Sequence, residues 1–319
     1  PATPYQNKFQ RVLIFTRSLF NAFLLKMSAA RRVFYLAAVL IFIVGLFVNN
    51  DAYIIFSFLI INFLLAFELA DKLIVRDDLE LAKKIQISLM PDSSPKNEFY
   101  DITAHTEAAQ HVGGDYFDFI ESEKSGKTFI VIGDISGKGM AAALYMVRVQ
   151  AIVNFLIANH SDVKEIIIEL KKYFAKRLKR EYFLTITIAS IDHKGKIRFC
   201  RAGHTPIFHF IKSKNEIVEL NPKGLALGLN DKGVFEKTLS EETIQTEKDD
   251  ILFFFTDGVT EMMNVHKMQF GEERIKKILI ENADKSAEEI KERVLDTVQR
   301  FRADAPVNDD LSLVVLKTK

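Results

Sequence analysis

The sequence predicts an α/β domain of antiparallel strands and packed helices, preceded by a membrane-spanning helical hairpin and a helical stalk. Two observations lead to this prediction. Two uncharged apolar runs lie near the start of the chain, and strand-like and helix-like segments follow in irregular order. A regular strand-helix alternation would indicate a doubly wound parallel sheet, so the irregular order favours an antiparallel one. Four parts are expected: a basic amphipathic juxtamembrane segment (1–32), a two-span hairpin (33–70), a stalk and linker (71–95) and the α/β domain (96–319).

The bulk composition limits the functions that the chain can have. It has 319 residues, with 43 Lys and Arg against 42 Asp and Glu. A net charge near zero lacks the global positive field of nucleic-acid binding proteins, so no nucleic-acid partner is expected. The single cysteine, Cys200, excludes an internal disulfide and a thiolate metal cage. We expect it to be a small buried strand residue.

The basic segment comes first. The first 50 residues contain six Lys and Arg and no Asp or Glu. Apolar residues recur there at helical spacing and predict an amphipathic helix: Val12, Phe15, Leu19 and Phe23. Two interpretations are equally consistent with this helix. It lies on an anionic membrane face, or it packs on the hairpin or on a partner chain.

Two apolar runs, Val33–Val48 and Ala52–Phe67, predict the hairpin. Each has 16 residues, or about 24 Å of helix, and flanking residues can extend it to the roughly 30 Å of a hydrocarbon core. The polar turn Asn49–Asp51 places both ends on one side, and the preceding basic residues place that side in the cytoplasm. A hairpin buried in a soluble core is less favoured, because the second run has no polar face.

The stalk follows from an uninterrupted helical pattern between Glu68 and Met90, without Gly or Pro. A heptad seam about two heptads long runs along it: Val75, Leu79, Ala82, Gln86 and Leu89. We favour a dimerising stalk over an amphipathic helix that caps the next domain. Pro91–Pro95 is then a linker.

Apolar runs and helical patterns mark the elements of the α/β domain. Strands are expected at Phe129–Ile132, Phe183–Ile191, Ile197–Cys200, Ile251–Phe255 and Leu311–Leu316. The turn Asp192–Gly195 between two of them is a hairpin signal. Helices are expected at Met140–Ala158, Val163–Leu178 and Ala287–Phe301.

Acidic residues stand beside glycine at the edges of these strands. The four clusters are Gly113–Asp118, Gly133–Gly139, Thr256–Glu261 and Asn308–Ser312. One such pair is usually a turn, but several carboxylates without His or Cys form an oxygen-only site suited to Mg²⁺ or Mn²⁺. Two such ions about 3.5–4 Å apart can bind a bridging water, lower its pKa and hold a phosphoryl group.

Six ordered blocks between about Leu81 and Leu316 resemble the SpoIIE/RsbU-type phosphatases, a bacterial branch of the type-2C metal-dependent protein phosphatases (PPM). A lead-in helix resembling the family's, Ala82–Pro91, precedes them. The blocks are Val112–Asp118, Gly133–Met146, Ala202–Pro206, Leu227-Gly228, Thr256–Glu261 and Asp309-Asp310. The resemblance implies an αββα sandwich of two antiparallel sheets flanked by helices, and a metal-dependent serine/threonine phosphatase.

The resemblance also implies a ligand set for two divalent ions, Mn²⁺ or Mg²⁺. Asp115, Asp134, Asp257 and Asp309 are implied as catalytic metal ligands. The backbone carbonyl of Ile135 is implied as a further ligand, and Asp310 replaces Asp309 if the register shifts by one residue.

Four supporting residues are expected around these ligands. Asp118 is either a further ligand or a hydrogen-bonded turn residue, and Lys138 either steers phosphate or is solvated. His204 is expected to position a strand crossing in preference to acting as an acid or base. Glu261 is expected to order the Asp257 loop by hydrogen bonding.

The implied substrate is a phosphoserine or phosphothreonine on a STAS-domain anti-sigma-factor antagonist, in a partner-switching pathway that regulates a sigma factor. We expect a homodimer formed through the stalk, anchored in the bacterial inner membrane with its catalytic domain in the cytoplasm. Two alternatives remain: a catalytically silent, membrane-tethered signalling scaffold with a phosphatase fold, or another metal-dependent phosphate-handling enzyme.

Overall fold

The computed structural model describes residues 8–91, 93–95, 98–175, 181–192, 195–229 and 233–319. The chain divides into two compact units, Pro1–Leu79 and Glu80–Lys319. The division falls within one long helix, α3 (Asp51–Ser88), which contributes to both units.

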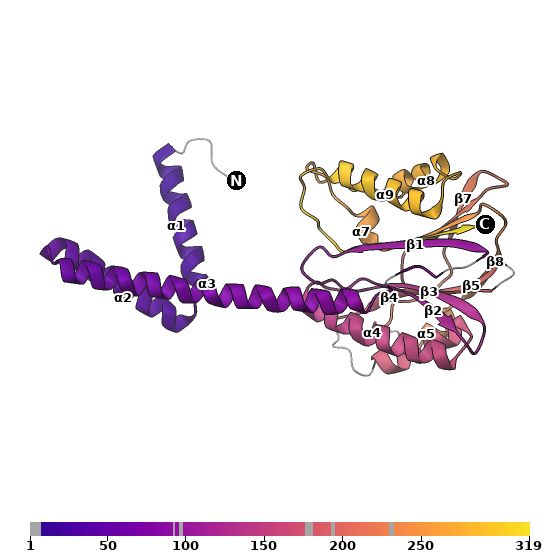
Figure 1. Ribbon diagram of the computed structural model, residues 1–319, viewed down its shortest axis with the longest axis horizontal. Coiled ribbons are helices and arrows are strands. Elements are labelled where there is room, and N and C mark those ends of the chain that lie inside the picture. The colour runs from indigo at the N-terminus through magenta and orange to yellow at the C-terminus, as the bar shows by residue number, and fades with distance from the viewer. Residues whose placement is uncertain (1–7, 92, 96–97, 176–180, 193–194, 230–232) are drawn as a thin grey trace. The chain divides into compact units, whose positions relative to one another are not determined.

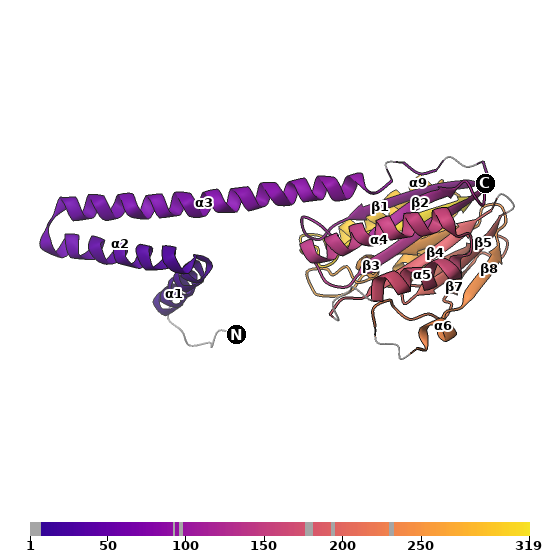
Figure 2. The ribbon, with the colours of Figure 1, turned by 90° about the horizontal axis from the view of Figure 1, so that it is seen from below.

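The first unit contains α1 (Lys8–Lys26), α2 (Ala29–Val48) and the first part of α3. Both predicted spans lie within single helices, and α2 runs beside α3 (Figure 2). Asn49 ends α2 in the left-handed conformation, with φ 57°. At Gly45 the helices approach closely, since an added Cβ would lie 3.0 Å from Ile54 Cγ1. The predicted helical hairpin is therefore present.

Among the described helices, three are long and apolar enough to cross a membrane: α2, α3 and α4 (Met140–Asn159). The apolar stretches of α2 and α3 are only 11% and 6% buried, whereas that of α4 is 39% buried. At the open end of the hairpin, Arg31 pairs with Glu68 at 3.3 Å and with Asp71 at 2.6 Å. Apolar helical surface with paired charges at one end is the pattern expected of membrane spans.

The helix α3 continues without a break through the predicted stalk to Ser88. Within the second unit, Gln86 on the predicted seam is only 6% exposed, because it packs into that unit. Leu81 and Ile85 are 58% and 52% exposed. Ile87 is 55% exposed as well. Leu81 and Ile85, four residues apart, form an exposed apolar stripe on a different face of the helix from the predicted seam.

In the part of the second unit that the structure describes, the strands form two five-stranded antiparallel sheets. The first sheet has the order β1 (Tyr100–Glu107), β10 (Leu311–Thr318), β9 (Ile251–Phe255), β6 (Ile207–Ile211) and β7 (Glu216–Leu220). The second has the order β2 (Tyr116–Ser122), β3 (Lys127–Ile135), β4 (Leu184–Ile191), β5 (Lys196–Ala202) and β8 (Glu241–Gln245).

Helices cover the outer face of each sheet (Figures 1 and 2). The first sheet packs against α8 (Glu272–Glu281) and α9 (Ala287–Arg302), and the second against α4 and α5 (Val163–Ala175). Two one-turn helices complete the unit, α6 (Phe235–Thr238) and α7 (Asp257–Thr260). The predicted αββα sandwich of two antiparallel sheets is confirmed.

Alternation along the strands fills three apolar layers. In β3, Phe129 and Val131 pack against α4 and α5, whereas Ile130 and Ile132 pack against the other sheet. Successive side chains of a strand point to opposite faces, so both faces of β3 are buried. Asp134 has the parity of Ile132 and therefore belongs to the face between the sheets.

The predicted strands and helices of this unit are found, with boundaries shifted by a few residues. Residues 176–178 of the predicted helix Val163–Leu178, and 193–194 of the predicted turn, lie outside the described residues. The sequence interpretation missed the strands β1, β2, β6, β7 and β8, the helix α8 and the one-turn helices α6 and α7. The strands β7 and β8 lie at sheet edges and carry Glu and Gln side chains, so their apolar alternation is weak.

Candidate metal centre

The predicted carboxylates gather at one edge of the sandwich, where the two sheets meet. Asp115 directly precedes β2, and Asp134 is the penultimate residue of β3. Asp257 begins α7 one residue after the end of β9, with Thr256 between them, and the Asp309-Asp310 pair directly precedes β10. The parity of β3 and β10 directs Asp134 and Asp310 between the sheets. Strands from both sheets thus deliver acidic groups to one place.

Asp310 holds the loop that carries Asp115. Its Oδ1 accepts a hydrogen bond from the Ala109 N–H at 2.7 Å, and its Oδ2 accepts one from the Gly114 N–H at 2.6 Å. A Cβ on Gly113 would lie 2.5 Å from Asp310 Oδ2, so only glycine permits this approach. Both Asp310 oxygens are engaged with backbone amides, which suits a positioning role better than that of a principal ligand.

Asp115 is buried and incompletely paired. It is 3% exposed, and its Oδ2 accepts a hydrogen bond from Thr256 Oγ1 at 2.8 Å. Its Oδ1 is buried without a hydrogen-bond partner among the described residues. Burial, followed by the charges of Asp134 and Asp310, raises the pKa of Asp115 well above its ordinary value. A buried, unpaired carboxylate oxygen is costly unless a cation or proton satisfies it.

Gly114 brings the backbone of β3 against this loop. An added Cβ would lie 2.6 Å from the Ile135 carbonyl oxygen and 3.3 Å from Asp134 Oδ1. The Ile135 N–H donates to the Gly114 carbonyl at 3.3 Å. The Ile135 carbonyl and the Asp134 carboxylate are therefore immediate neighbours of the Asp115 loop.

Electrostatic coupling links the remaining carboxylates. Burial, with the charges of Asp257, Asp309 and Asp310, raises the pKa of Asp134 from 3.8 to about 7. Burial, with the charges of Asp309 and Glu261, raises the pKa of Asp257. The five aspartates thus share one region of negative potential.

The donor set of this edge fits a hard divalent ion. It consists of carboxylate and carbonyl oxygens, which Mg²⁺ and Mn²⁺ prefer, and it includes the unpaired Asp115 Oδ1. As the side chains lie, no group of three or more His, Cys, Asp or Glu among the residues described could hold one ion. The carboxylates are neighbours that repel one another, so closing a ligand sphere requires side-chain rotation.

Asp118 and Glu261 both form hydrogen bonds near this edge. Asp118 Oδ2 accepts hydrogen bonds from the Tyr116 hydroxyl at 2.8 Å and from Asn154 Nδ2 at 3.0 Å, on the α4 side of the second sheet. Asp118 therefore makes these side-chain hydrogen bonds on the face of β2 that α4 covers. The Glu261 N–H donates to the Asp257 carbonyl at 2.7 Å, which closes the single turn of α7.

His204 and Lys138 also have defined partners. His204 is 3% exposed, and its Nδ1 lies 3.0 Å from Thr185 Oγ1. Burial, with the charge of Arg201, lowers the pKa of His204 to about 3, so its imidazole is neutral at neutral pH. Lys138 Nζ lies 3.0 Å from Asp309 Oδ2 and also donates to the Asn308 carbonyl.

Two residues of the site were missed in the sequence. Thr256 is fully buried, donates to Asp115 and accepts from the Ser312 N–H at 2.9 Å. Gln86 pairs with the backbone of Gly113. Two features of the sequence could have indicated them. Thr256 is a hydroxyl residue directly after an apolar strand, and Gln86 is a polar residue on an otherwise apolar heptad seam.

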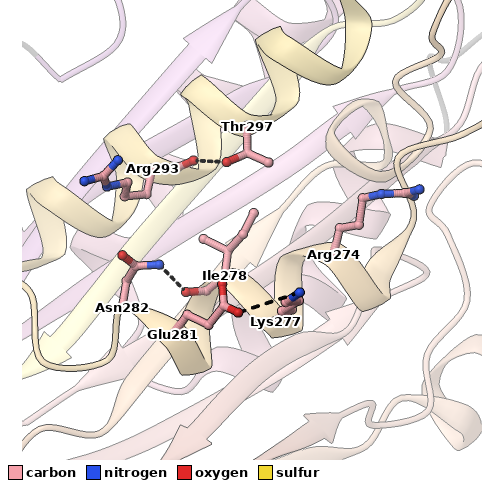
Figure 3. Close-up of a pocket in the computed structure, with 7 residues that line it drawn as sticks. All are labelled: Arg274, Lys277, Ile278, Glu281, Asn282, Arg293 and Thr297. Atoms are coloured by element: carbon pink, nitrogen blue, oxygen red, sulfur yellow. Dashed lines mark hydrogen bonds and ion pairs between the residues drawn. The ribbon is translucent and has the colours of Figure 1, made fainter.

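Two of the hollows in the second unit bear on where the site lies. One, of about 320 Å³, is lined by Asp115 and Asp310 together with Gln86 and Met90, and it adjoins the carboxylate edge. The other, of about 500 Å³, lies between α8 and α9 (Figure 3). It contains none of the predicted site residues, and Lys277 in it pairs with Glu281. The predicted metal ligands therefore favour the first hollow as the functional site.

The sequence is similar to a protein-family model and to proteins of known family. A family model described as stage II sporulation protein E (SpoIIE) matches residues 124–319. Phosphoserine phosphatase RsbU of Bacillus subtilis (strain 168) is 27% identical over 249 residues, which cover 77% of this chain and 71% of RsbU. Protein IcfG of Synechocystis sp. is 26% identical over 256 residues, covering 70% of this chain and 38% of IcfG.

Solved structures share the fold. The SiaA-PP2C domain of Pseudomonas aeruginosa superposes with a TM-score of 0.68 at 20% identity, covering 78% of this chain and 99% of that domain. The PP2C phosphatase domain with a regulatory fragment of SpoIIE from Bacillus subtilis gives 0.58 at 19% identity, covering 69% and 63%. The RsbU and RsbW domains of Rv1364c from Mycobacterium tuberculosis give 0.57 at 21% identity, covering 69% and 60%.

These likenesses confirm the resemblance seen in the sequence blocks and the PP2C fold of the second unit. Because the family model matches more than half of the chain, this protein belongs to the SpoIIE family.

Proposed function

We propose that this chain is a metal-dependent serine/threonine protein phosphatase that attacks a phosphoryl group with metal-activated water. The serine/threonine phosphatase class follows from membership of the SpoIIE family and from the likeness to phosphoserine phosphatase RsbU. The metal chemistry rests on one observation, the gathering of five aspartates at one edge of the sandwich, where the Oδ1 of the buried Asp115 has no hydrogen-bond partner among the described residues.

In this proposal, the chain's own groups hold and orient two divalent ions. The ligands are Asp115, Asp134, the Ile135 carbonyl, Asp257 and Asp309, with Asp310 as a positioning neighbour. Two ions at this edge would supply a hydroxide at neutral pH and neutralise phosphoryl oxygens. Thr256 orients Asp115, and Gly114 keeps the Ile135 carbonyl close to it. Both Mn²⁺ and Mg²⁺ suit these oxygens.

The test is phosphate release by the full chain in detergent, from a phosphoprotein and from p-nitrophenyl phosphate, with and without Mn²⁺ or Mg²⁺. Asp134→Asn and Asp257→Asn should abolish release while the circular dichroism spectrum stays unchanged. Asp118→Asn is the matched control. This aspartate is also buried, but it is hydrogen-bonded to Tyr116 and Asn154 on the face of β2 that α4 covers. Metal-independent release, or full activity in both site variants, would rule the proposal out.

The proposed substrate is a phosphorylated STAS-domain protein, an anti-sigma-factor antagonist of a partner-switching pathway. The likeness to RsbU, and to a protein in which RsbU and RsbW domains occur together, supports this substrate class. Phosphorylated STAS proteins should be dephosphorylated faster than a phosphoserine peptide of the same local sequence. Binding without turnover would instead favour a silent scaffold, and turnover of nucleotides would favour another phosphate-handling enzyme.

The proposed location is the bacterial inner membrane, with the catalytic unit in the cytoplasm. The exposed apolar surfaces of α2 and the first part of α3 support this anchor. The proposed homodimer forms along the stalk, where Leu81 and Ile85 are exposed. Fractionation of cells, followed by protease digestion from either side of the membrane, tests the topology. Recovery of the full chain in the soluble fraction would contradict it.

A further inference from the structure

Lys138 places an ammonium group directly over the carboxylate edge. Its Nζ is 3.0 Å from Asp309 Oδ2 and also donates to the Asn308 carbonyl. Burial raises the pKa values of Asp134, Asp257 and Asp310, and the charge of Lys138 opposes all three rises. One ammonium group is therefore within electrostatic reach of both sides of the edge.

The two glycines beside Lys138 determine the direction of its side chain. Gly137 and Gly139 flank it with φ values of 98° and 74°, which are left-handed conformations that favour glycine. The following residue, Met140, begins α4. The Lys138 side chain is 43% exposed, so it approaches Asp309 from the solvent side and is not packed in the core. A partly exposed, four-carbon arm can change partners without rearranging the fold.

Lys138 and a divalent ion require the same carboxylate. In the structure, Asp309 Oδ2 is occupied by the ammonium, and Asp309 Oδ1 accepts the Asp310 N–H at 3.0 Å. Use of Asp309 as a metal ligand therefore competes with the Lys138 ion pair. An ammonium released at this point remains beside the reaction site, where a phosphoryl dianion is its strongest available partner.

We propose that Lys138 is a built-in counter-cation that exchanges partners during the reaction. It neutralises Asp309 while that carboxylate is free of metal, and it donates to a phosphoryl oxygen of the substrate when Asp309 serves as a ligand. Lys138 is thus both a competitor for metal binding and a substrate-binding residue. This inference rests on the proposed phosphatase function and adds a second task to the same site.

The test replaces the charge and keeps the length of the arm. In Lys138→Met, Mn²⁺ affinity measured by calorimetry on the full chain without substrate should tighten roughly threefold, as expected for loss of a partly exposed competing ion pair. The KM for a phosphoprotein should rise about tenfold, as for loss of one charge-assisted hydrogen bond, while kcat changes less. Lys138→Arg should restore most of the KM.

Lys124→Met is the matched control, because Lys124 also donates to a backbone carbonyl, that of Asn159, and is exposed. It should change neither quantity. Unchanged or weaker Mn²⁺ binding in Lys138→Met would show that Lys138 does not compete with the metal for Asp309. An unchanged KM would show that Lys138 does not contact the phosphoryl group. Lys138→Gln is a second neutral variant if the methionine variant does not fold. If the wild-type chain hydrolyses no phosphoester at all, the phosphatase proposal fails, whereas the Mn²⁺ titration still decides the competition.

Discussion

The side-chain amide of Gln86 pairs with both backbone polar groups of Gly113. Its Nε2 donates to the Gly113 carbonyl at 2.6 Å, and its Oε1 accepts from the Gly113 N–H at 3.1 Å. Gln86 lies near the end of α3, and Gly113 lies two residues before Asp115. A planar amide with one donor and one acceptor engaged fixes this loop in a single orientation. The end of α3 therefore supports the carboxylate edge.

Removing this pair should weaken the site from a distance. Gln86→Ala leaves two buried backbone groups without partners, so we expect a loss of about 1–3 kcal/mol in the free energy of unfolding. Metal affinity should fall as well, because the Asp115 loop is released. Denaturant unfolding and Mn²⁺ calorimetry measure the two effects. The exposed Lys84→Ala on the same helix is the control, and equal behaviour of both variants would refute the supporting role.

Close approach at Gly114 predicts a steric effect. In Gly114→Ala the new methyl group would lie 2.6 Å from the Ile135 carbonyl, so the Asp115 loop and β3 must separate. We expect phosphatase activity and metal binding to be lost together. Gly126→Ala meets no neighbour but has φ 63°, so it should cost only about 1–2 kcal/mol of stability. An active Gly114→Ala enzyme with normal metal affinity would show that the Ile135 carbonyl is not needed.

Thr256 is expected to orient Asp115. Thr256→Val has nearly the same shape but removes the hydrogen bond to Asp115 Oδ2 and leaves the Ser312 N–H unpaired. Loss of a partner that orients a metal ligand typically lowers metal affinity about 10–100-fold. Thr297→Val, on the exposed surface of α9, is the control. Calorimetry with Mn²⁺ should separate the variants, and identical affinities would argue against Asp115 as a ligand.

The pH dependence of the metal-free protein follows from Asp134. Its pKa in the folded state is raised from 3.8 to about 7, so the folded state binds more protons than the unfolded state between these values. The stability contributed by Asp134 is therefore full below about pH 4 and is lost as the pH rises towards about 7. His204, whose pKa is lowered to about 3, acts in the opposite direction over part of this range.

Because Asp134 and His204 act in opposite directions, the contribution of Asp134 to stability is measured as a difference between the wild type and a variant. Melting temperatures of the wild type and of Asp134→Asn, taken in a chelator from pH 4 to pH 7, isolate the Asp134 contribution. The wild type should lose stability relative to the variant as the pH rises, and added Mn²⁺ should reverse this loss. Parallel curves would show that Asp134 titrates normally and would weaken the case for a buried carboxylate cluster.

The exposed stripe on the end of α3 predicts the dimer face. Leu81→Lys combined with Ile85→Lys should shift the full chain in detergent from dimer to monomer, because burial of two apolar side chains is replaced by charge repulsion. Light scattering and cross-linking report the change. Ile280→Lys alters an exposed apolar residue on α8 and serves as the control. A monomeric wild type would remove the proposed dimer.

Much of this protein is determined by local sequence. The two candidate spans are visible in the sequence because an uncharged run longer than a core strand has few other stable environments. Strands such as β9 are visible because both faces are buried, which makes the run continuously apolar. The site aspartates stand out because each follows or precedes such a run beside glycine or another aspartate.

Only the tertiary structure decides how these pieces meet. Asp310 bonds to Gly114 across 196 positions, and Thr256 bonds to Asp115 across 141 positions. No local pattern encodes these pairings, because they depend on which strands become neighbours. The same holds for Gln86, whose place on a heptad seam indicated a partner helix but whose amide binds Gly113. The sequence alone therefore determines which groups reach the strand ends, and the packing of two sheets determines which of them share a site.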